Sequence, residues 1–417
     1  MGHSKSETGR IYLSGPDTKL LKGAIRITGS KSESNRLLLL QALYPQIKIE
    51  NLSNSDDSRV MQQGLASNDD RIDIHHAGTA MRFLTAYFSG QEGRELVLTG
   101  SDRMKQRPIR ILVEALNALG ARITYTERPG CPPLKIRGTQ LKGGSVSLPA
   151  DVSSQYISAL LLIAPSLPEG LKLNLEGRIT SLPYIQMTLG LLTRLGIPCD
   201  MKGNTILVSS VSDLQQQTCV VESDWSSASY FYSLLALAKP GSRISLEAYR
   251  EGSLQGDSVL QSIFSKLGVR SDFKGSQLIL TRDPDIQESH LKLDLLEAPD
   301  LAQTLAVCCF GLGISCELTG LHTLKIKETD RLHALHAELT KMGASLMVTE
   351  DSLHLQGGHS PRKDQTIATY NDHRMAMAFA PLALRTTLYI ADAGVVTKSY
   401  PGYWEDLGRL GIKIENA

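Results

Sequence analysis

Four consecutive residues, Asn371-Asp372-His373-Arg374, place an amide, a carboxylate, an imidazole and a guanidinium directly ahead of the apolar run 375–379. The apolar run predicts a helix, which Asn371 or Asp372 can cap. The unpaired N–H groups and the positive dipole end of that helix would then lie beside the Arg374 guanidinium. This combination is typical of a site that binds phosphate or carboxylate.

Cations occupy several other junctions between a loop and a predicted helix. Lys31 and Arg36 precede the apolar run 37–40, although this segment is not a P-loop, because G-x-x-x-x-G-K-[ST] is absent. Arg107 and Lys398 each precede a predicted helix in the same way. Any one of them could be a solvated cation beside a capped helix. Their repetition favours local anion sites.

Neutral hydrogen-bonding groups gather at two further helix starts. Ser153, Ser154 and Gln155 precede an apolar helix, and Ser181 with Tyr184 opens the next one. A serine in such a position is commonly an N-cap, so one of the two adjacent serines is expected to cap its helix.

Two carboxylates lie at comparable junctions. Asp300 precedes an apolar helix, where an N-cap is the default role. Glu328 lies three residues before Arg331, a spacing that also suits a simple surface ion pair. Because Lys327, Glu328 and Arg331 share one loop-to-helix junction, we expect this segment to contribute to the anion site instead.

The loop His75-His76-Ala77-Gly78 enters another predicted helix. Adjacent histidines lack the i, i+4 spacing of a helical metal pair, and the six cysteines show no C-x-x-C spacing. No metal site is therefore predicted, and the cysteines are expected to be buried free thiols. Gly78 would let a ligand approach the backbone closely.

Length and charge limit the classes of function. A chain of 417 residues suggests two domains or one large α/β unit. Its 44 Lys and Arg nearly balance 43 Asp and Glu, which argues against a nucleic-acid or anionic-membrane partner. The apolar run 301–316 is shorter than the roughly 20 residues that cross a bilayer. No signal-peptide core precedes the strand-like sequence at Ile11, so a cytoplasmic protein is expected.

A helix ending in a Leu-Gly or Met-Gly pair, followed by a β-prone segment, recurs along the chain. The glycines are Gly120, Gly196, Gly268, Gly343 and Gly411, at intervals of 68 to 76 residues, with Gly64 as a weaker sixth member. Such regularity predicts one mixed α/β unit used six times, three before about residue 222 and three after.

Taken in order, these segments resemble the 5-enolpyruvylshikimate-3-phosphate synthase family. The resemblance runs from Lys31 to Lys398. The segments that carry it are GSKSESNR at 29–36, AGTAMR at 77–82, RMKQRP at 103–108, SSQ at 153–155, QGD at 255–257, KETDR at 327–331 and NDHRMAMA at 371–378.

The resemblance implies an α/β protein with the two-domain enolpyruvyl transferase fold, an inside-out α/β barrel. Each domain would contain three βαβαββ units around inward-facing helices. Residues 30–222 would form the shikimate 3-phosphate side. Residues 1–29 with 223–417 would carry the phosphoenolpyruvate-side cations and the catalytic Asp and Glu. The substrates would be enclosed when the domains close.

The implied reaction transfers the enolpyruvyl group of phosphoenolpyruvate to the 5-hydroxyl of shikimate 3-phosphate, in the shikimate pathway of aromatic amino acid biosynthesis. It proceeds by addition and elimination through a tetrahedral intermediate. Asp300 would be the base for the hydroxyl, and Glu328 would manage the methyl proton, assisted by Lys31 or Lys398. The resemblance implies no metal and no cofactor, and a monomer is expected.

The binding residues are carried over position by position. For shikimate 3-phosphate they are Lys31, Ser32, Arg36, Ser153, Ser154, Gln155, Ser181, Tyr184, Asp300, Thr323 and Lys327. For phosphoenolpyruvate they are Lys31, Gly78, Arg107, Gln155, Arg331, His373, Arg374 and Lys398. The arginines are the least replaceable, because a guanidinium matches the plane of a carboxylate or phosphate with two N–H groups.

Three positions depart from the residues usual in this family. His76 stands where Asn is common, Phe83 where Pro is common, and Thr323 where Asn commonly contacts the shikimate phosphate. Sensitivity to glyphosate, which occupies the phosphoenolpyruvate site, is therefore left open, although Gly78 favours it.

Three alternatives follow from the same residues. A UDP-N-acetylglucosamine enolpyruvyl transferase would carry a cysteine in the loop 100–106, which has none. An RNA 3′-phosphate cyclase, of related fold, is disfavoured by the balanced charge and the 5% aromatic content. A catalytically silent relative that only binds shikimate 3-phosphate is supported by His76 and Thr323 alone.

Overall fold

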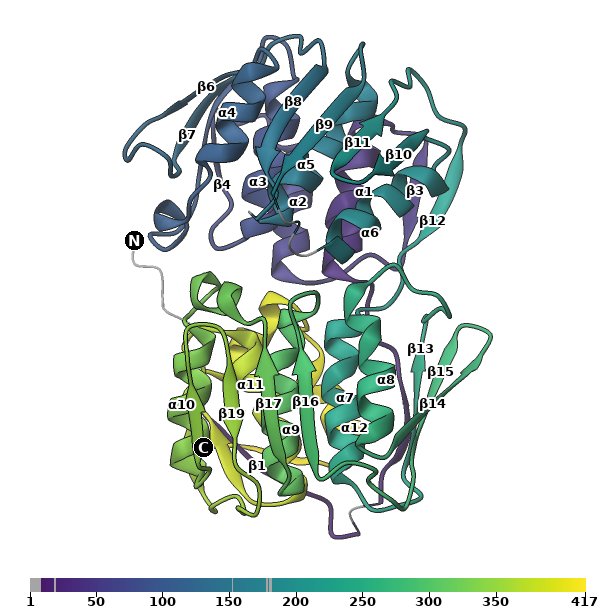
Figure 1. Ribbon diagram of the computed structural model, residues 1–417, viewed down its shortest axis with the longest axis vertical. Helices are drawn as coiled ribbons and strands as arrows, with labels where there is room; N and C mark the ends of the chain where they lie inside the picture. The colour runs from purple at the N-terminus through teal and green to yellow at the C-terminus, as the bar shows by residue number, and fades with distance from the viewer. Residues whose placement is uncertain (1–8, 19, 152, 178, 180–181) are drawn as a thin grey trace. The chain divides into compact units, whose positions relative to one another are not determined.

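The computed structural model describes the chain except for residues 1–8, 19, 152, 178 and 180–181. Contacts within the chain divide it into two compact units. Unit one comprises Met1–Thr28 with Glu222–Ala417, and unit two comprises Gly29–Val221. Each unit has its sheets on the outside and helices within (Figure 1).

The described strands form six sheets, three in each unit, and five of the sheets have the same four-stranded topology. In four of the five, two parallel strands are followed by an antiparallel hairpin along one edge, whereas in the fifth the two antiparallel strands come from opposite ends of the described chain. In unit two these sheets are β4 (Arg71–Asp73), β5 (Glu95–Thr99), β7 (Leu134–Arg137) and β6 (Arg122–Tyr125), and β8 (Gly144–Pro149), β9 (Leu171–Glu176), β11 (Thr205–Val208) and β10 (Cys199–Lys202).

Unit one contains the other three four-stranded sheets. They are β2 (Lys22–Ile25), β13 (Arg243–Glu247), β15 (Gln277–Arg282) and β14 (Val269–Lys274); β16 (His290–Asp294), β17 (Ser315–Thr319), β19 (Leu353–Leu355) and β18 (Leu346–Val348); and β20 (Gln365–Ile367), β21 (Leu388–Ile390), β1 (Ile11–Ser14) and β22 (Lys413–Asn416).

The sixth sheet, in unit two, has only β3 (Ile47–Glu50) parallel to β12 (Gln217–Val220). After β3 and α2 (Asp56–Ala66) the chain enters β4 of the next sheet without forming a hairpin. The predicted six-unit architecture is therefore confirmed, with the hairpin missing from one unit.

The helix-ending glycines explain how each hairpin starts. Gly120, Gly196, Gly268, Gly343 and Gly411 have φ between 77° and 102°, a left-handed conformation that costs glycine little. Each lies between an outer helix and the next strand, which is the first strand of a hairpin in four cases and, after Gly411, is β22, the partner of β1. The prediction for Gly64 was wrong, because Gly64 lies inside α2, where a Cβ would come within 2.5 Å of Leu84 Cδ1. Gly64 thus permits close helix packing instead of ending the helix.

Helices alternate between inner and outer positions along each repeat. In unit two the inner helices are α1 (Lys31–Leu43), α3 (Gly78–Ser89) and α5 (Ser154–Ile163), and the outer ones are α2, α4 (Arg110–Ala118) and α6 (Leu182–Arg194). In unit one the inner helices are α7 (Trp225–Leu237), α9 (Ala302–Leu312) and α11 (His373–Phe379), and the outer ones are α8 (Leu260–Lys266), α10 (Arg331–Met342) and α12 (Tyr403–Arg409).

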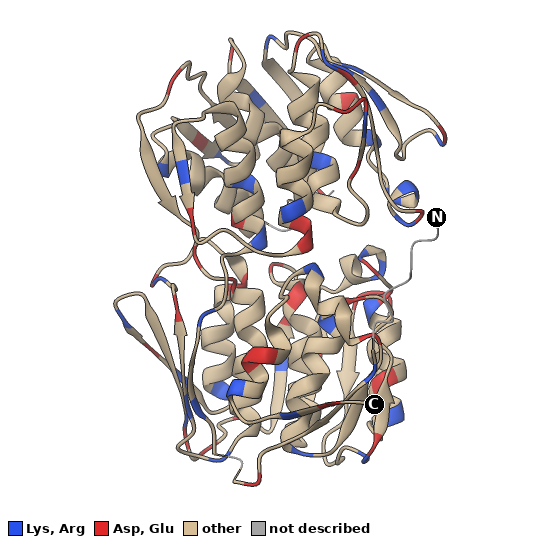
Figure 2. Ribbon diagram, turned by 180° about the vertical axis from the view of Figure 1, so that it is seen from behind, with Lys and Arg blue, Asp and Glu red and all other residues tan. Residues whose placement is uncertain are grey.

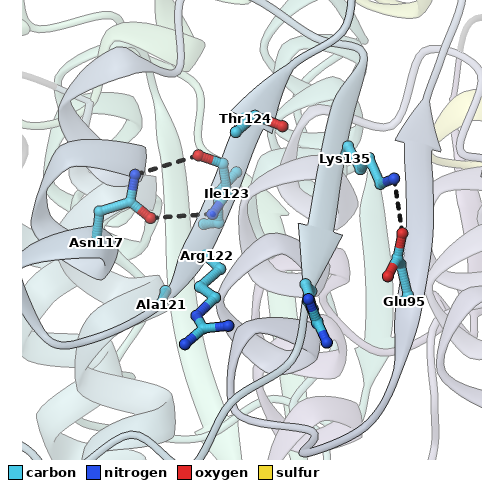
Figure 3. A pocket seen from close by; sticks show the side chains of 8 residues that line it. Glu95, Asn117, Ala121, Arg122, Ile123, Thr124 and Lys135 are labelled. Atoms are coloured by element: carbon cyan, nitrogen blue, oxygen red, sulfur yellow. Dashed lines mark hydrogen bonds and ion pairs between the residues drawn. The ribbon is translucent and has the colours of Figure 1, made fainter.

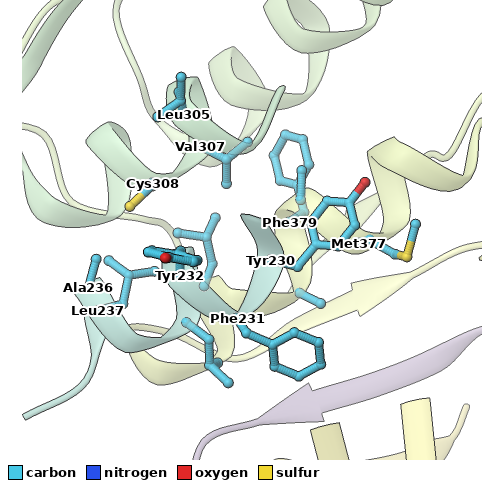
Figure 4. Packing of buried hydrophobic residues seen from close by; sticks show 14 of the residues in the cluster. Tyr230, Phe231, Tyr232, Ala236, Leu237, Leu305, Val307, Cys308, Met377 and Phe379 are labelled. Atoms are coloured by element: carbon cyan, nitrogen blue, oxygen red, sulfur yellow. The ribbon is translucent and has the colours of Figure 1, made fainter. Parts of the chain in front are cut away.

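The inner helices of unit one form its hydrophobic core. Phe231, Leu305 and Phe379, one from each inner helix, are fully buried and pack together (Figure 4). No helix of the described residues is long and apolar enough to cross a membrane. The cysteines are free thiols; four are buried, but Cys199 and Cys219 are partly exposed, since both lie in β-strands with one solvated face.

Acidic and basic residues are interspersed along the backbone of both units (Figure 2). This agrees with the near balance of 44 cations and 43 anions in the chain. Concentrations of one charge must therefore be sought locally, at the starts of the inner helices.

Candidate active site

The described residues of the predicted site form two sets, one in each unit, at or near the first turns of helices. Lys31, Gly78 and Ser154 are the first residues of the three inner helices of unit two. The starts of α3 and α5 lie together, since Gln155 and Thr79, each the second residue of its helix, are joined by a hydrogen bond. Ser181 lies outside the described residues.

Arg36 joins the inner helices of unit two to α6. Its Nε donates to Thr188 Oγ1 at 2.8 Å, and its Nη2 donates to Ser158 Oγ at 2.9 Å and to the Tyr184 carbonyl at 3.3 Å. Nη1 donates to the Ser32 carbonyl at 2.8 Å. Burial lowers the pKa of Arg36 to about 10, which still leaves it charged at neutral pH. The guanidinium thus fixes the segments that present Ser32 and Tyr184.

Phe83, one of the unusual residues, is fully buried, with its ring centroid 5.6 Å from Arg36 Cζ. An aromatic face at this distance can stabilise the guanidinium by a cation–π contact. Phe83 therefore supports Arg36 from α3.

Lys31 and His76 share one carboxylate. Lys31 Nζ is 3.3 Å from Asp57 Oδ2, and His76 Nε2 is 3.7 Å from Asp57 Oδ1. Asp57 lies in the first turn of α2 and is largely buried. The charge at the start of α1 is consequently set by three side chains rather than by Lys31 alone.

The Arg107 guanidinium lies directly over the backbone of Gly78. A Cβ at Gly78 would lie 2.5 Å from Arg107 Nη1. Buried Arg82 holds this arrangement, since Nη1 donates to the Gly78 carbonyl at 3.1 Å and Nη2 to the Pro108 carbonyl at 2.9 Å. The N-terminus of α3 and Arg107 therefore form a compact group of N–H donors.

The family resemblance predicts that Gly78 and Arg107 bind phosphoenolpyruvate. On that prediction, Gly78→Ala is expected to raise the KM for this compound by about five- to 150-fold, because one overpacked contact costs about 1–3 kcal/mol. The added methyl would displace the Arg107 guanidinium, while the helix itself tolerates alanine. Steady-state kinetics at saturating shikimate 3-phosphate measure the change.

Gly90→Ala, at the other end of α3, is the matched control. A Cβ added at Gly90 would be 3.7 Å from the nearest neighbouring atom, and the φ of −91° at this position suits any residue. An equal rise in KM in both variants, or none in Gly78→Ala, would contradict the assigned role of Gly78.

The two serines at the start of α5 have different roles. Ser153 is the N-cap and accepts from the Gln155 N–H at 3.4 Å, whereas Ser154 is the first helical residue. Gln155 Nε2 donates to Thr79 Oγ1 at 3.2 Å, which connects the start of α5 to the start of α3. The expectation that one serine caps the helix is confirmed.

In unit one, Arg331 binds three carboxylates with its three nitrogens. Nε is 2.7 Å from Asp372 Oδ2, Nη1 is 2.8 Å from Asp300 Oδ1, and Nη2 is 2.8 Å from Glu328 Oε2. The Arg331 side chain is only 2% exposed, so its pair with Glu328 is not the simple surface pair that the spacing also allowed. Burial would lower the pKa of Arg331, but Asp372, Glu328 and Asp300 raise it above its usual value.

Asp300 lies among three cations. Arg374 Nη2 is 3.0 Å from Oδ2, while Oδ1 is 2.8 Å from Arg331 Nη1 and 3.7 Å from Lys327 Nζ. Its carboxylate caps no helix, since Ala298 and Leu301 occupy the N-cap positions. Burial alone would raise the pKa of Asp300, but Arg374, Lys327 and Arg331 outweigh it and hold the pKa well below its usual value.

Asp257, from the QGD segment, adds a further carboxylate beside Asp300. Ser226, in the first turn of α7, donates to Asp257 and lies 3.3 Å from Arg374 Nη2. Burial and then the charge of Asp300 raise the pKa of Asp257 to about 6. The two carboxylates thus differ in proton affinity, which is a common feature of acid–base sites.

Lys398 is anchored beside the start of α11. Its Nζ donates to the Asn371 carbonyl at 2.6 Å and to Asn371 Oδ1 at 2.8 Å. Asn371 and Tyr370 have φ of 57° and 53°, a left-handed conformation that asparagine tolerates but that is unfavourable for tyrosine. Buried Glu338 holds this turn, accepting from the Tyr370 hydroxyl at 2.8 Å and the Ala368 N–H at 3.1 Å.

Two other predicted residues have different surroundings. Thr323 lies in the 3₁₀ helix η5 (His322–Ile326), and its Oγ1 is buried without a hydrogen-bond partner. His373 is 2% exposed, with Nδ1 3.8 Å from Asp372 Oδ1. Neither side chain contacts Asp300 or Arg374 through a hydrogen bond described in this structure.

An open pocket of about 510 Å³ lies on the sheet formed by β4, β5, β7 and β6 (Figure 3). Arg122, Lys135 and Arg137 line it, and Glu95 pairs with Lys135 at 2.7 Å. These side chains are exposed, and no predicted site residue lines this pocket.

Several residues of the two clusters were not among the predicted site residues. Asp57 and Glu338 lie in helices whose sequence shows nothing unusual, and no sequence signal pointed to them. Asp257 lies within a segment that carried the resemblance, which is the signal that could have found it. Asp372 was predicted as a cap, a role it fills by accepting from the Arg374 N–H at 2.9 Å, but not as a partner of Arg331.

Comparison with known proteins supports the same interpretation. A family model described as EPSP synthase (3-phosphoshikimate 1-carboxyvinyltransferase) matches residues 62–407. A 3-phosphoshikimate 1-carboxyvinyltransferase of Bacteroides fragilis is 45% identical over 414 residues, covering 97% of this chain and 99% of the relative. One of Methanospirillum hungatei is 35% identical, covering 91% and 94%.

The fold has counterparts among solved structures. An EPSP synthase from Acinetobacter baumannii superposes with a TM-score of 0.78 over 98% of this chain and all of that one, at 23% identity. At that identity the superposition supports the fold alone, whereas the family model and the relatives support membership. The chain therefore belongs to the EPSP synthase (3-phosphoshikimate 1-carboxyvinyltransferase) family.

Proposed function

We propose that this protein transfers the enolpyruvyl group of phosphoenolpyruvate to the 5-hydroxyl of shikimate 3-phosphate and releases phosphate. The observation that carries the proposal, beside family membership, is the Asp300 carboxylate held between Arg331 and Arg374 with Glu328 on the same arginine. A base, a second carboxyl group and paired guanidinium groups are what this reaction requires.

The chemistry has two steps. In the first, the methylene carbon of phosphoenolpyruvate gains a proton and the 5-hydroxyl oxygen bonds to the adjacent carbon, while the hydroxyl proton passes to a base. In the second, the resulting methyl group loses a proton, the double bond reforms, and the bond to the phosphate oxygen breaks. We assign the hydroxyl proton to Asp300 and the methyl proton to Glu328, with Lys31 and Lys398 assisting.

The cations around Asp300 also explain how its basicity could depend on the substrates. Arg374, Lys327 and Arg331 hold its pKa well below the usual value against the effect of burial. Substrate phosphate and carboxylate groups would partly neutralise the same cations, so the carboxylate would become a stronger base once both substrates are bound.

The binding roles are proposed from the family resemblance and are supported by the local geometry of each unit. Lys31, Arg107, Arg331 and Arg374 are proposed to hold phosphoenolpyruvate, with His373 and Lys398 at the start of α11. Gly78 lets the ligand reach the backbone N–H groups of α3. Ser32, Ser153, Ser154, Gln155, Ser181, Tyr184, Thr323 and Lys327 are proposed to contact shikimate 3-phosphate, with Arg36 fixing Ser32 and Tyr184.

The two compact units are proposed to be the two domains of the fold, with unit two as the shikimate 3-phosphate side. The protein is further proposed to act as a monomer in the cytoplasm, on small-molecule substrates only. Size-exclusion chromatography of the purified protein would test the monomer, since a dimer would elute near twice the mass of 45.5 kDa.

Phosphate release on mixing the protein with phosphoenolpyruvate and shikimate 3-phosphate tests the activity. Release that requires both compounds is expected. Release with UDP-N-acetylglucosamine in place of shikimate 3-phosphate would favour the related transferase instead. Binding of shikimate 3-phosphate without any release would indicate a catalytically silent relative.

A further inference from the structure

In unit two, one carboxylate lies close to two basic side chains that come from different elements. Asp57, in the first turn of α2, lies 3.3 Å from Lys31 Nζ, at the start of α1, and 3.7 Å from His76 Nε2, in the loop before α3. The side chains of Asp57, Lys31 and His76 are 10%, 21% and 37% exposed. The His76 side chain is thus partly exposed, although Nε2, the nitrogen that faces Asp57, is itself buried.

The charge of this group depends on His76. With a neutral imidazole, the charges of Lys31 and Asp57 cancel. With a protonated imidazole, the same carboxylate is shared by two cations, and the group carries one net positive charge. Among the three side chains, histidine is the one that ordinarily titrates near neutral pH.

Two other charged side chains belong to the same helix starts. Glu33 is buried in the first turn of α1, and Arg107 lies over Gly78, two residues after His76. Asp56 is 3.9 Å from Arg59, and Asp73 is 3.9 Å from His75, on exposed side chains. His75 is therefore a second histidine in the same loop that faces a different carboxylate.

We propose that His76 is a positioning residue for phosphoenolpyruvate, acting through Asp57 on the charge that Lys31 presents to this anion. The inference rests on the proposed function and on the phosphoenolpyruvate contact that the family resemblance implies for Lys31. An asparagine at this position would leave Asp57 paired with Lys31 at every pH, so the effect belongs to chains that carry histidine here.

The sign of the effect follows from the charges. As the pH falls through the range in which His76 gains its proton, phosphoenolpyruvate binds more tightly and its KM decreases. One added charge a few ångströms away, at the high effective dielectric of a partly exposed site, changes affinity by about three- to tenfold. By reciprocity, the bound anion favours the protonated form of His76.

The test compares wild type, His76→Asn and His75→Asn, measuring kcat and the KM for phosphoenolpyruvate from about pH 5.5 to 8.5. The phosphate of the substrate also titrates, but equally for all three proteins, so the ratio of variant to wild-type KM is the readout. For His76→Asn this ratio is expected to be near one at high pH and to reach about three to ten at low pH.

The control should behave differently. His75 has a φ of 48°, a left-handed conformation that asparagine tolerates well, so His75→Asn should fold normally and follow wild type at every pH. The kcat of His76→Asn should follow that of wild type. Parallel KM profiles for His76→Asn and wild type, or an equal change in His75→Asn, would overturn the inference.

A second measurement does not need catalysis. The imidazole C–H resonance of His76, identified by its absence in His76→Asn, should titrate with a midpoint that moves to lower pH in Asp57→Asn and to higher pH when phosphoenolpyruvate is added. If wild type released no phosphate, the proposed function would fail while this titration still tested the link to Asp57. A midpoint unmoved in Asp57→Asn would refute that link.

Discussion

Asp300→Asn is expected to lower kcat by about 10²- to 10⁴-fold, the usual contribution of a positioned general base. Asparagine has nearly the same shape, and its amide oxygen can still accept a hydrogen bond from one of Arg331 and Arg374, although its NH2 group can only donate. It cannot, however, take the proton of the attacking hydroxyl. Single-turnover phosphate release, at substrate concentrations far above KM, measures the loss.

The binding constants separate this role from a purely electrostatic one. Removing a negative charge from among Arg374, Lys327 and Arg331 leaves more positive charge for the anionic substrates, so KM should stay constant or fall. A variant with near-normal kcat and lower KM would show that Asp300 merely balances charge. Glu317→Gln is the control, since Glu317 pairs with Lys292 at 2.9 Å on an exposed strand and should change neither constant.

Much of the fold could be predicted because its signals are local. A glycine after an amphipathic helix is required wherever the chain turns in a left-handed conformation; four such glycines mark hairpin starts, and the fifth, Gly411, precedes β22. The cap at Asp372 was also predictable, because its partner, the Arg374 N–H, is two residues away. These features depend on neighbours within a few residues.

Gly64 shows where local patterns fail. It follows an amphipathic segment, as the other five do, yet it lies inside α2 and packs against Leu84. The difference is that no hairpin follows α2 before the next sheet begins. Only the tertiary packing of α2 on α3 distinguishes a glycine that permits close approach from one that ends a helix.

The carboxylate partners of the site were the least predictable feature. Arg331 and Asp372 are 41 residues apart, and Ser226 meets Asp257 across 31 residues. Glu328 and Arg331 are close enough in sequence for a pair to be expected, but the burial of Arg331 depends on Asp300 and Asp372, which other elements supply. The sequence therefore indicates which residues gather, and the fold decides how their charges are paired.

Arg331→Lys is expected to lower the Tm of the protein by about 6 to 20 °C, even though the charge is unchanged. Lysine has a single nitrogen, which cannot reach Asp372, Asp300 and Glu328 with the geometry of the three arginine nitrogens. Breaking a buried pair costs about 3–5 kcal/mol, and about 2–4 °C of Tm corresponds to each kcal/mol for a unit of this size.

Thermal unfolding followed by circular dichroism measures this change, with Arg409→Lys as the control. Arg409 is 58% exposed and pairs with Glu405 at 2.7 Å on α12, so its replacement should shift the Tm by less than about 2 °C. A similarly small shift in Arg331→Lys would show that the buried cluster adds little to stability.

Combining Arg331→Lys with Asp372→Asn tests the cause of the destabilisation. Asp372 is fully buried, and in Arg331→Lys its charge loses a 2.7 Å partner. Asparagine removes that charge and still caps α11, because Asn is as good an N-cap as Asp. The double variant should therefore recover part of the lost Tm, whereas additive losses would mean that packing around the guanidinium, and not an unpaired carboxylate, accounts for the effect.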